Sequence, residues 1–223
     1  MPPIPEVPPL ENGDRLNRVE FERRYEAMPN LKKAELIEGI VFLTFAVRAL
    51  QHGSPHAALV GCLGVYRAAT LGVRAADSTS VRLDLENEPR PDGLMLIESA
   101  CGGQTRISLD DFVEGAPELV AEVAVGLESI ELHDKLRAYQ RNGVREYVVW
   151  RVLDQAIDWF VLRNSQFERL APDSAGILKS EVFPGLWLDA PAMLRGDLAT
   201  VFAVLQQGIA DPAHAAFVAK LQK

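Results

Sequence analysis

The sequence predicts a single α/β or α+β domain whose core is a mixed β-sheet flanked by helices. Two segments, Gly93–Glu98 and Leu119–Val125, are almost continuously apolar, which is typical of strands buried on both faces. Segments with the helical spacing of apolar residues lie before and after these strands. The 223 residues show no internal repeat and no linker, and this length suffices for one domain with a full core.

The N-terminal part of the chain is expected to hold an arm, a helix and a hairpin. Residues 1–17 are rich in proline, which predicts a flexible extended arm. Residues 18–28 have the pattern of a helix that ends before Pro29. Residues 34–43 are two short apolar strands on either side of Glu38-Gly39, which predicts a hairpin with a tight turn.

A second helix is predicted to start at Ser54-Pro55, because proline is favoured in the first helical turn, and to stop at Gly72. His52 would then lie outside this helix. His52 and His56 have the spacing of a helical zinc pair, but this helix start and the lack of a Glu after His52 argue against zinc.

The remaining elements alternate between short strands and helices, and they are predicted in the following order. They are one or two strands over 73–85, a strand over 93–98, a loop over 99–115, a strand over 119–125, a helix from Ser129 to Asn142-Gly143, strands over 146–151 and 157–162, a strand or turn over 183–188, and helices over 198–206 and 213–221. The main domain is expected to span residues 18–190. The C-terminal helices of residues 191–223 are expected to pack on the same domain.

Composition restricts the class of protein. No run approaches the roughly 18 apolar residues that a membrane span needs, and the first residues lack the pattern of a signal peptide. Cys62 and Cys101 show no metal-binding spacing, which fits a reducing compartment and predicts a cytoplasmic protein without a membrane partner. The formal net charge of −8 argues against tight non-specific binding of nucleic acid, but a nuclease with a local basic patch is compatible with it.

Two acidic residues interrupt the apolar strands. Asp92 stands at the start of the first strand and Glu122 lies inside the second. A carboxylate in an apolar strand is costly unless it is paired or binds a cation. If the two strands are neighbours, Asp92 and Glu122 would share a Mg²⁺ ion, which prefers oxygen ligands. The alternative is that each acid lies in solvent at a strand end or pairs with an arginine.

Three further residues are candidates for the same site. Lys135 stands beside the apolar stripe of its helix, so its long stem would carry the ammonium to the end of the sheet; the alternative is a solvated helix lysine. Glu35 is a third acid, either a ligand or water-orienting base or an ordinary edge-strand acid. His56 is a possible auxiliary residue in the first helical turn, and Tyr139 is expected to pack in the core.

Several motifs occur in an order that resembles a known family of nucleases. They are Ala34–Gly39, His56 at a helix start, Arg90-Pro91-Asp92, Val113–Val123, Asp134-Lys135-Leu136 with Tyr139, Gly143–Tyr147 and Phe183–Leu186. This order resembles the Uma-type restriction endonucleases of the PD-(D/E)XK nuclease superfamily over residues 21–189.

The resemblance implies a restriction-endonuclease-like core that hydrolyses DNA phosphodiester bonds. It further implies Mg²⁺ as the cofactor, for which Mn²⁺ would substitute, and no organic cofactor. Asp92 and Glu122 are implied as the metal ligands and Glu35 as the auxiliary acid. Lys135 is implied as the catalytic lysine, since Ala124 occupies the place of the usual one. Superfamily members often form dimers, so a homodimer is expected.

Two other functions remain open at this point. Residues 124–129 lack the Ser-Pro-Ser type of loop that the family has after its Glu-Val. With the acidic net charge, this favours a catalytically inactive nuclease fold that acts as a binding or regulatory module. A metal-dependent hydrolase that is not a nuclease would use the same acids.

Overall fold

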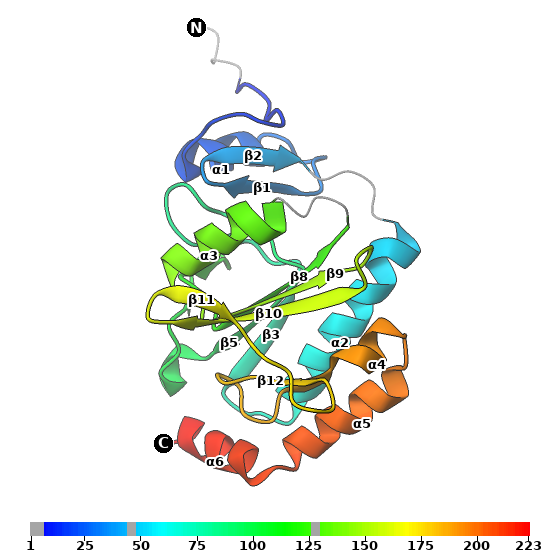
Figure 1. The fold of residues 1–223 in the computed structure, drawn as a ribbon. Coiled ribbons are helices and arrows are strands. Elements are labelled where there is room, and N and C mark those ends of the chain that lie inside the picture. The colour runs from blue at the N-terminus through cyan, green and yellow to red at the C-terminus, as the bar shows by residue number, and fades with distance from the viewer. Residues whose placement is uncertain (1–6, 44–47, 126–129) are drawn as a thin grey trace, which may run out of the picture.

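The computed structural model describes residues 7–43, 48–125 and 130–223, with the side chains of 130 and 131 left aside. A six-stranded sheet forms the centre of the molecule (Figure 1). In sheet order its strands are β11 (Gln166–Arg169), β10 (Ala156–Arg163), β9 (Glu146–Arg151), β8 (Leu119–Ala124), β5 (Gly93–Ile97) and β3 (Val73–Asp77). β8 and β9 are parallel and every other pair is antiparallel, so the predicted mixed sheet is confirmed.

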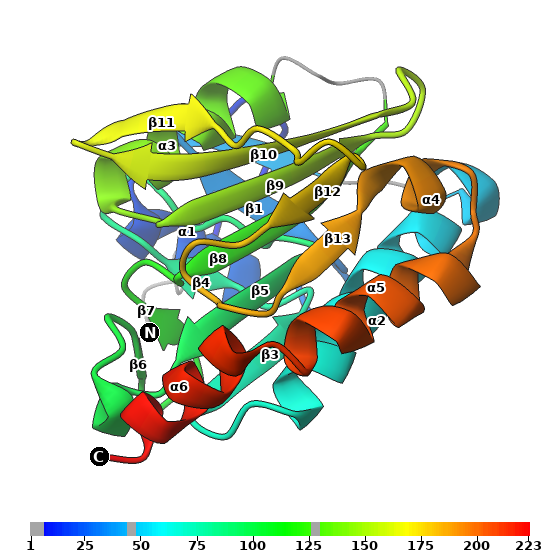
Figure 2. The same ribbon diagram turned by 60° about the horizontal axis from the view of Figure 1, so that its bottom comes forward.

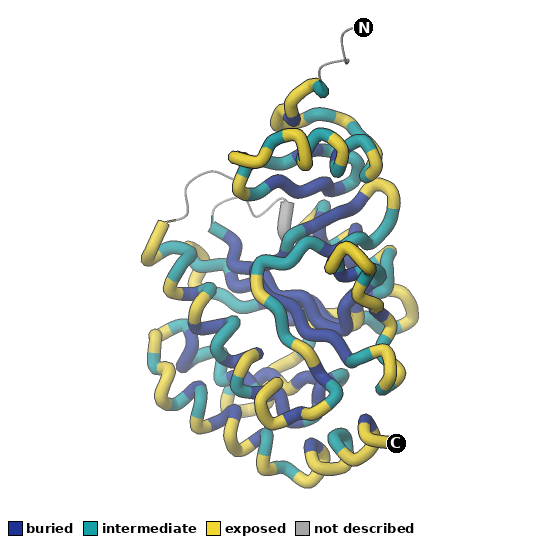
Figure 3. The backbone as a smooth tube through the Cα atoms, turned by 180° about the vertical axis from the view of Figure 1, so that it is seen from behind, coloured by how far each residue is buried: buried dark blue, intermediate teal, exposed yellow. Residues whose placement is uncertain are grey.

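Different layers cover the two faces of this sheet. One face packs against α2 (Ser54–Ala68), the hairpin of β12 (Ile177–Lys179) and β13 (Trp187–Asp189), and α5 (Leu198–Ile209) (Figure 2). The opposite face packs against α3 (Leu136–Asn142). Because strand side chains alternate between faces, neighbouring residues of β8 contribute to different cores. Figure 3 shows the buried residues concentrated in the central strands.

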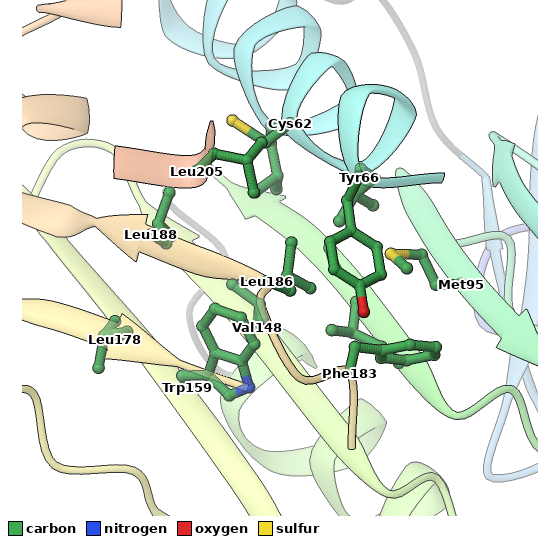
Figure 4. Packing of buried hydrophobic residues seen from close by; sticks show 14 of the residues in the cluster. Cys62, Tyr66, Met95, Val148, Trp159, Leu178, Phe183, Leu186, Leu188 and Leu205 are labelled. Carbon is green, nitrogen blue, oxygen red and sulfur yellow. The ribbon is translucent and has the colours of Figure 1, made fainter. Parts of the chain in front are cut away.

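The larger core lies between the sheet and the C-terminal layer (Figure 4). Tyr66 of α2 and Phe183 meet edge to face with their ring centroids 6.1 Å apart. The Tyr66 hydroxyl donates a hydrogen bond to the carbonyl oxygen of Pro184 at 2.8 Å, so the polar tip of this buried ring is satisfied. The turn before β13 is therefore attached to α2.

The C-terminal residues complete this layer. They form α4 (Ala190–Leu194), α5 and α6 (Pro212–Leu221). Asp211 caps α6 by accepting a hydrogen bond from the Ala213 amide, which agrees with the start that Asp211-Pro212 predicts. Within the described residues, no helix is both long enough and apolar enough to cross a bilayer.

A smaller N-terminal layer lies above α3 and carries its own apolar cluster (Figure 1). It consists of α1 (Arg18–Glu26) and a hairpin of β1 (Ala34–Ile37) and β2 (Ile40–Leu43). Glu38 and Gly39 both have positive φ, +52° and +73°, as a two-residue turn of the predicted kind requires.

The flexible arm predicted to reach residue 17 is shorter than expected, because residues 10–16 lie along β2. The amides of Gly13 and Leu16 donate to the carbonyl oxygens of Val41 and Gly39, each at 2.8 Å, and Leu10 is buried. The physical reason is that β2 has an open edge whose backbone groups need partners. Residues 1–6 lie outside the described part of the chain.

Two further predictions need correction. The segment 99–115 is not only loop, because β6 (Arg106–Ile107) and β7 (Val113–Glu114) form a small sheet with β4 (Val81–Arg82). The second correction concerns the start of α2, where a turn of π-helix over Ala49–Gly53 runs directly into the helix. His52 therefore lies in a helical turn, because the amides of the residues before Pro55 bond backward to Arg48 and Ala49.

Candidate active site

The register of two neighbouring strands brings Asp92 and Glu122 together. β5 and β8 pair antiparallel with Gly93 opposite Ala121, so the next position outward sets Asp92 opposite Glu122. Alternation along each strand turns both side chains toward the face that α3 covers, and both are buried. The sequence alone does not determine this pairing, since it depends on which strands are neighbours.

Asp92 is held by hydrogen bonds from two other elements. Its Oδ2 accepts a hydrogen bond from the Val123 amide at 2.8 Å and lies 3.2 Å from His52 Nε2. Burial would raise the pKa of Asp92, but the hydrogen bond from His52, the charges of Lys33 and His52 and the Val123 amide together lower it to about 2. Asp92 is therefore a carboxylate at neutral pH.

Glu122 lies in a different electrostatic environment. Its Oε1 accepts hydrogen bonds from Lys135 Nζ at 2.8 Å and from the Tyr139 hydroxyl at 3.0 Å. Burial raises the pKa of Glu122 to about 7, with further upward contributions from the charges of Asp92 and Glu35, while Lys135 opposes the shift. The neighbouring carboxylates and the burial together outweigh the effect of the lysines on the pKa of Glu122.

Lys135 connects the sheet to the N-terminal hairpin. Its side chain is buried and its Nζ lies 2.9 Å from Glu35 Oε1 and 2.8 Å from Glu122 Oε1. The alternative of a solvated helix lysine is therefore wrong. Glu35 does lie in a strand of a two-stranded sheet, but it is buried and paired with Lys135, unlike an ordinary edge-strand acid. Glu35 also accepts a hydrogen bond from the Arg90 amide at 2.7 Å. Burial alone would raise the pKa of Glu35, but the charges of Lys135 and Lys33 lower it overall, so Glu35 is a carboxylate at neutral pH.

His56 reaches the site through the backbone. Its Nε2 lies 2.9 Å from the carbonyl oxygen of Asp92 and 2.9 Å from Asp77 Oδ1. It therefore links α2 to the start of β5 without contacting the carboxylate of Asp92. The carboxylate contact is made by His52, whose ring centroid lies 5.6 Å from that of His56.

Three residues that contact the carboxylates of the site were not predicted from the sequence. For two of them, the spacing from a predicted site residue already placed them on the same face. Tyr139, expected to be simply core packing, is four residues after Lys135 and so on the same face of the helix. Lys33 is two residues before Glu35, the spacing of one strand face, and its Nζ lies 3.9 Å from both Glu35 Oε2 and Asp92 Oδ1. His52 had no such signal, because Pro55 suggested a helix start after it.

Replacing Tyr139 with phenylalanine is expected to lower the free energy of unfolding by about 1–2 kcal/mol, since a buried hydrogen bond to a carboxylate is lost. Urea denaturation measures the change. The matched control is Tyr25→Phe, whose hydroxyl makes an exposed 3.4 Å contact with the Lys32 carbonyl and is expected to matter by less than about 0.5 kcal/mol. Equal effects of the two substitutions would contradict a role for Tyr139 in holding Glu122.

The chemistry of these groups fits a hard divalent cation. Asp92 and Glu122 offer carboxylate oxygens as ligands. Together with Glu35 they make three buried carboxylates, and the lysines that pair with them are Lys33 and Lys135. No group of three or more His, Cys, Asp or Glu residues suited to a metal occurs among the described residues. Mg²⁺ does not require one, because it keeps several waters and is commonly held by one or two carboxylates.

Comparisons with known proteins point to nucleases. The sequence model of the Uma2 family, described as "putative restriction endonuclease", matches residues 19–191. Among solved structures, the chain is similar to a putative nuclease belonging to DUF820 from Anabaena variabilis, with a TM-score of 0.56 and 12% sequence identity. The match covers 82% of this chain and 97% of that one, and at this identity it shows the fold alone. No curated protein matches.

Proposed function

The chain belongs to the Uma2 family of restriction-endonuclease-like proteins, and we propose on this basis that it is a Mg²⁺-dependent endonuclease that hydrolyses DNA phosphodiester bonds. Family membership and a nuclease-like fold support nuclease function. The observation that carries the finer proposal is the opposed pair of Asp92 and Glu122, with buried Lys135 bonded to both Glu122 and Glu35.

Asp92 and Glu122 would hold the metal ion, and Mn²⁺ would substitute for Mg²⁺. When bound, such an ion polarises a phosphate oxygen and lowers the pKa of a bound water. Oxygen-only donors on the two strands are the chemistry that either ion accepts.

The chain's own residues keep these carboxylates in place. Val123 and His52 fix one oxygen of Asp92, while Lys135 and Tyr139 fix one oxygen of Glu122. Such fixed partners prevent a ligand side chain from rotating away, which matters because misplacement of a catalytic group is costly in rate. The Lys135–Glu35 pair supports this arrangement from the N-terminal hairpin.

Removal of divalent metal is expected to abolish strand cleavage. Supercoiled plasmid incubated with the purified protein and Mg²⁺ or Mn²⁺ should convert to nicked and linear forms, and EDTA should stop the conversion until excess metal is restored. Agarose gels read out the result. Absence of cleavage with either ion, or cleavage that EDTA does not affect, would contradict the proposal.

An inactive nuclease fold that binds DNA is the second candidate. The formal net charge of −8 and the departure from the family pattern at residues 124–129 favour it. Residues 126–129 lie outside the described part of the chain, so the shape of that loop does not enter the proposal. Binding of DNA without cleavage would favour this candidate. A two-fold dimer, in which two sites reach both strands, belongs to the endonuclease proposal.

A further inference from the structure

Two lysines approach the carboxylates of the site, and they differ in accessibility. The side chain of Lys135 is 3% exposed and its Nζ is within hydrogen-bond distance of Glu35 and Glu122. The side chain of Lys33 is 24% exposed, and its Nζ lies 3.9 Å from Glu35 Oε2 and 3.9 Å from Asp92 Oδ1. Of these two lysines, Lys33 is therefore the one that combines proximity to the acids with access from solvent.

Lys135 is committed to the carboxylates. A contact between Lys135 and a substrate would require its ammonium to leave Glu35 and Glu122, which would then be buried charges without their partner. Breaking a buried ion pair in this way is strongly unfavourable. Lys135 is therefore a positioning residue, which holds Glu122 and joins β8 to β1.

Lys33 is held near the site by charge rather than by hydrogen bonds. A separation of 3.9 Å exceeds the 2.7–3.2 Å of an N–H···O bond. Within residues 7–43, 48–125 and 130–223, the Nζ of Lys33 forms ion pairs at 3.9 Å but donates no hydrogen bond to another protein group. Toward the described residues, the N–H donors of Lys33 are therefore unused.

The backbone around Lys33 is fixed relative to Asp92. The Arg90 side chain donates from Nη1 to the Lys32 carbonyl at 2.8 Å and from Nε to the Ser78 carbonyl at 2.6 Å. The Arg90 amide donates to Glu35. Residues on both sides of Lys33 are therefore attached to the segment that carries Asp92, and the Lys33 ammonium lies between the carboxylates of Asp92 and Glu35, 3.9 Å from each.

We propose that Lys33, and not Lys135, is the lysine that contacts the scissile phosphate of the nucleic acid. This assignment rests on the proposed nuclease function and concerns the same site. A phosphodiester that approaches three carboxylates meets repulsion, and a compact ammonium with three donors on a flexible stem offsets it. Lys33 carries such a charge at the solvent side of these acids.

The salt dependence of DNA binding tests this proposal without requiring cleavage. The dissociation constant of a fluorescent 20-base-pair duplex is measured in EDTA at several salt concentrations, for wild type, Lys33→Gln, Lys33→Arg and Lys220→Gln. Lys220 is an exposed lysine of α6, in the layer on the opposite side of the sheet from α3, and is the matched control. Thermal melting of each variant verifies that it is folded.

Lys33→Gln is expected to weaken binding roughly tenfold at low salt and to reduce the slope of log K against log salt by about 0.9, the effect of one lost phosphate contact. Lys33→Arg should restore most of the slope, and Lys220→Gln should leave it unchanged. In the plasmid assay, Lys33→Gln should lower kcat/KM and Lys33→Arg should recover part of it.

Failure of the Lys33 assignment can be distinguished from failure of the nuclease proposal. An unchanged slope in Lys33→Gln, with metal-dependent cleavage by wild type, overturns the Lys33 assignment and leaves the nuclease proposal standing. A reduced slope in Lys33→Gln, with no cleavage by wild type, supports the phosphate contact and overturns the nuclease proposal. No DNA binding by wild type overturns both.

Discussion

Asp92→Asn and Glu122→Gln are each expected to lower the rate of metal-dependent plasmid cleavage by roughly a thousandfold or more. Each substitution removes a carboxylate charge from the pair that would hold the ion, and metal-ion catalysis contributes several kcal/mol of transition-state stabilisation. The side chains keep their size, so packing in the buried site is retained. Initial rates of nicking at saturating Mg²⁺ measure the effect.

The matched control for these variants is Glu98→Gln. Glu98 follows the other end of β5, where its carboxylate pairs with Arg74 at 3.0 Å on the surface. Its loss should leave the rate of cleavage within about a factor of two, as expected of an exposed ion pair. Circular dichroism and thermal melting verify that all three variants are folded. Cleavage by Asp92→Asn at the wild-type rate would exclude Asp92 as a metal ligand.

Lys135→Met is expected to destabilise the protein by about 3–5 kcal/mol at pH 8, because it leaves Glu122 and Glu35 as buried carboxylates without their shared cation. Methionine has a similar length and fills the space of the lysine stem. Urea denaturation at fixed pH gives the free energy of unfolding. The double variant Lys135→Met with Glu122→Gln should recover part of the loss, since one of the unpaired charges is then absent.

The cost of Lys135→Met should fall as the pH is lowered to 5. The pKa of Glu122 is raised to about 7, so the stability that its protonated form contributes is fully present below about 4.5 and is lost as pH rises through 7. Removal of Lys135, which opposes this shift, moves the folded pKa higher still, and Glu122 is then protonated at pH 5. The pKa of Glu35 also rises when Lys135 is removed.

A pH-independent loss of stability would contradict this account of Lys135. It would indicate that the substitution acts through packing of the stem rather than through the charges of Glu122 and Glu35. The same measurement on Lys220→Met, an exposed lysine of α6, sets the baseline for losing any lysine charge and is expected to stay within about 0.5 kcal/mol.

The buried strands could be predicted from sequence because burial on both faces leaves a continuous apolar run, as in β5 and β8. In the small sheet, β4 lies within the one or two strands predicted over 73–85, but β6 and β7 could not be predicted, since each has two residues and β6 is exposed. β11 escaped prediction for a related reason: its residues are mostly exposed and polar. β11 is held by its hairpin with β10, whereas the small sheet depends on the pairing of β4 with β7, which is distant in sequence.

Some residues of the candidate site could likewise be predicted from the sequence, and others could not. Asp92 and Glu122 were identifiable because each is a charge in an apolar strand, but their opposition depends on a register that only the fold supplies. The role of His52 was hidden for a local reason, since a π-helical turn before Pro55 is not encoded by a simple residue pattern. Lys33 follows another lysine, and only its spacing of two residues from Glu35 distinguishes it from Lys32.

Because strand pairing places Asp92 opposite Glu122, it also determines where insertions and deletions are compatible with the site. The two positions are matched by strand pairing, so the number of residues in the connection between β5 and β8 does not enter the chemistry. Leu109 is fully exposed and lies in this connection, where residues can be added or deleted without disturbing the pairing of β5 with β8. One residue inserted in β8 before Glu122 would instead turn that carboxylate to the opposite face of the sheet. Insertions and deletions are therefore expected around Leu109, between β6 and β7, and not within the strands.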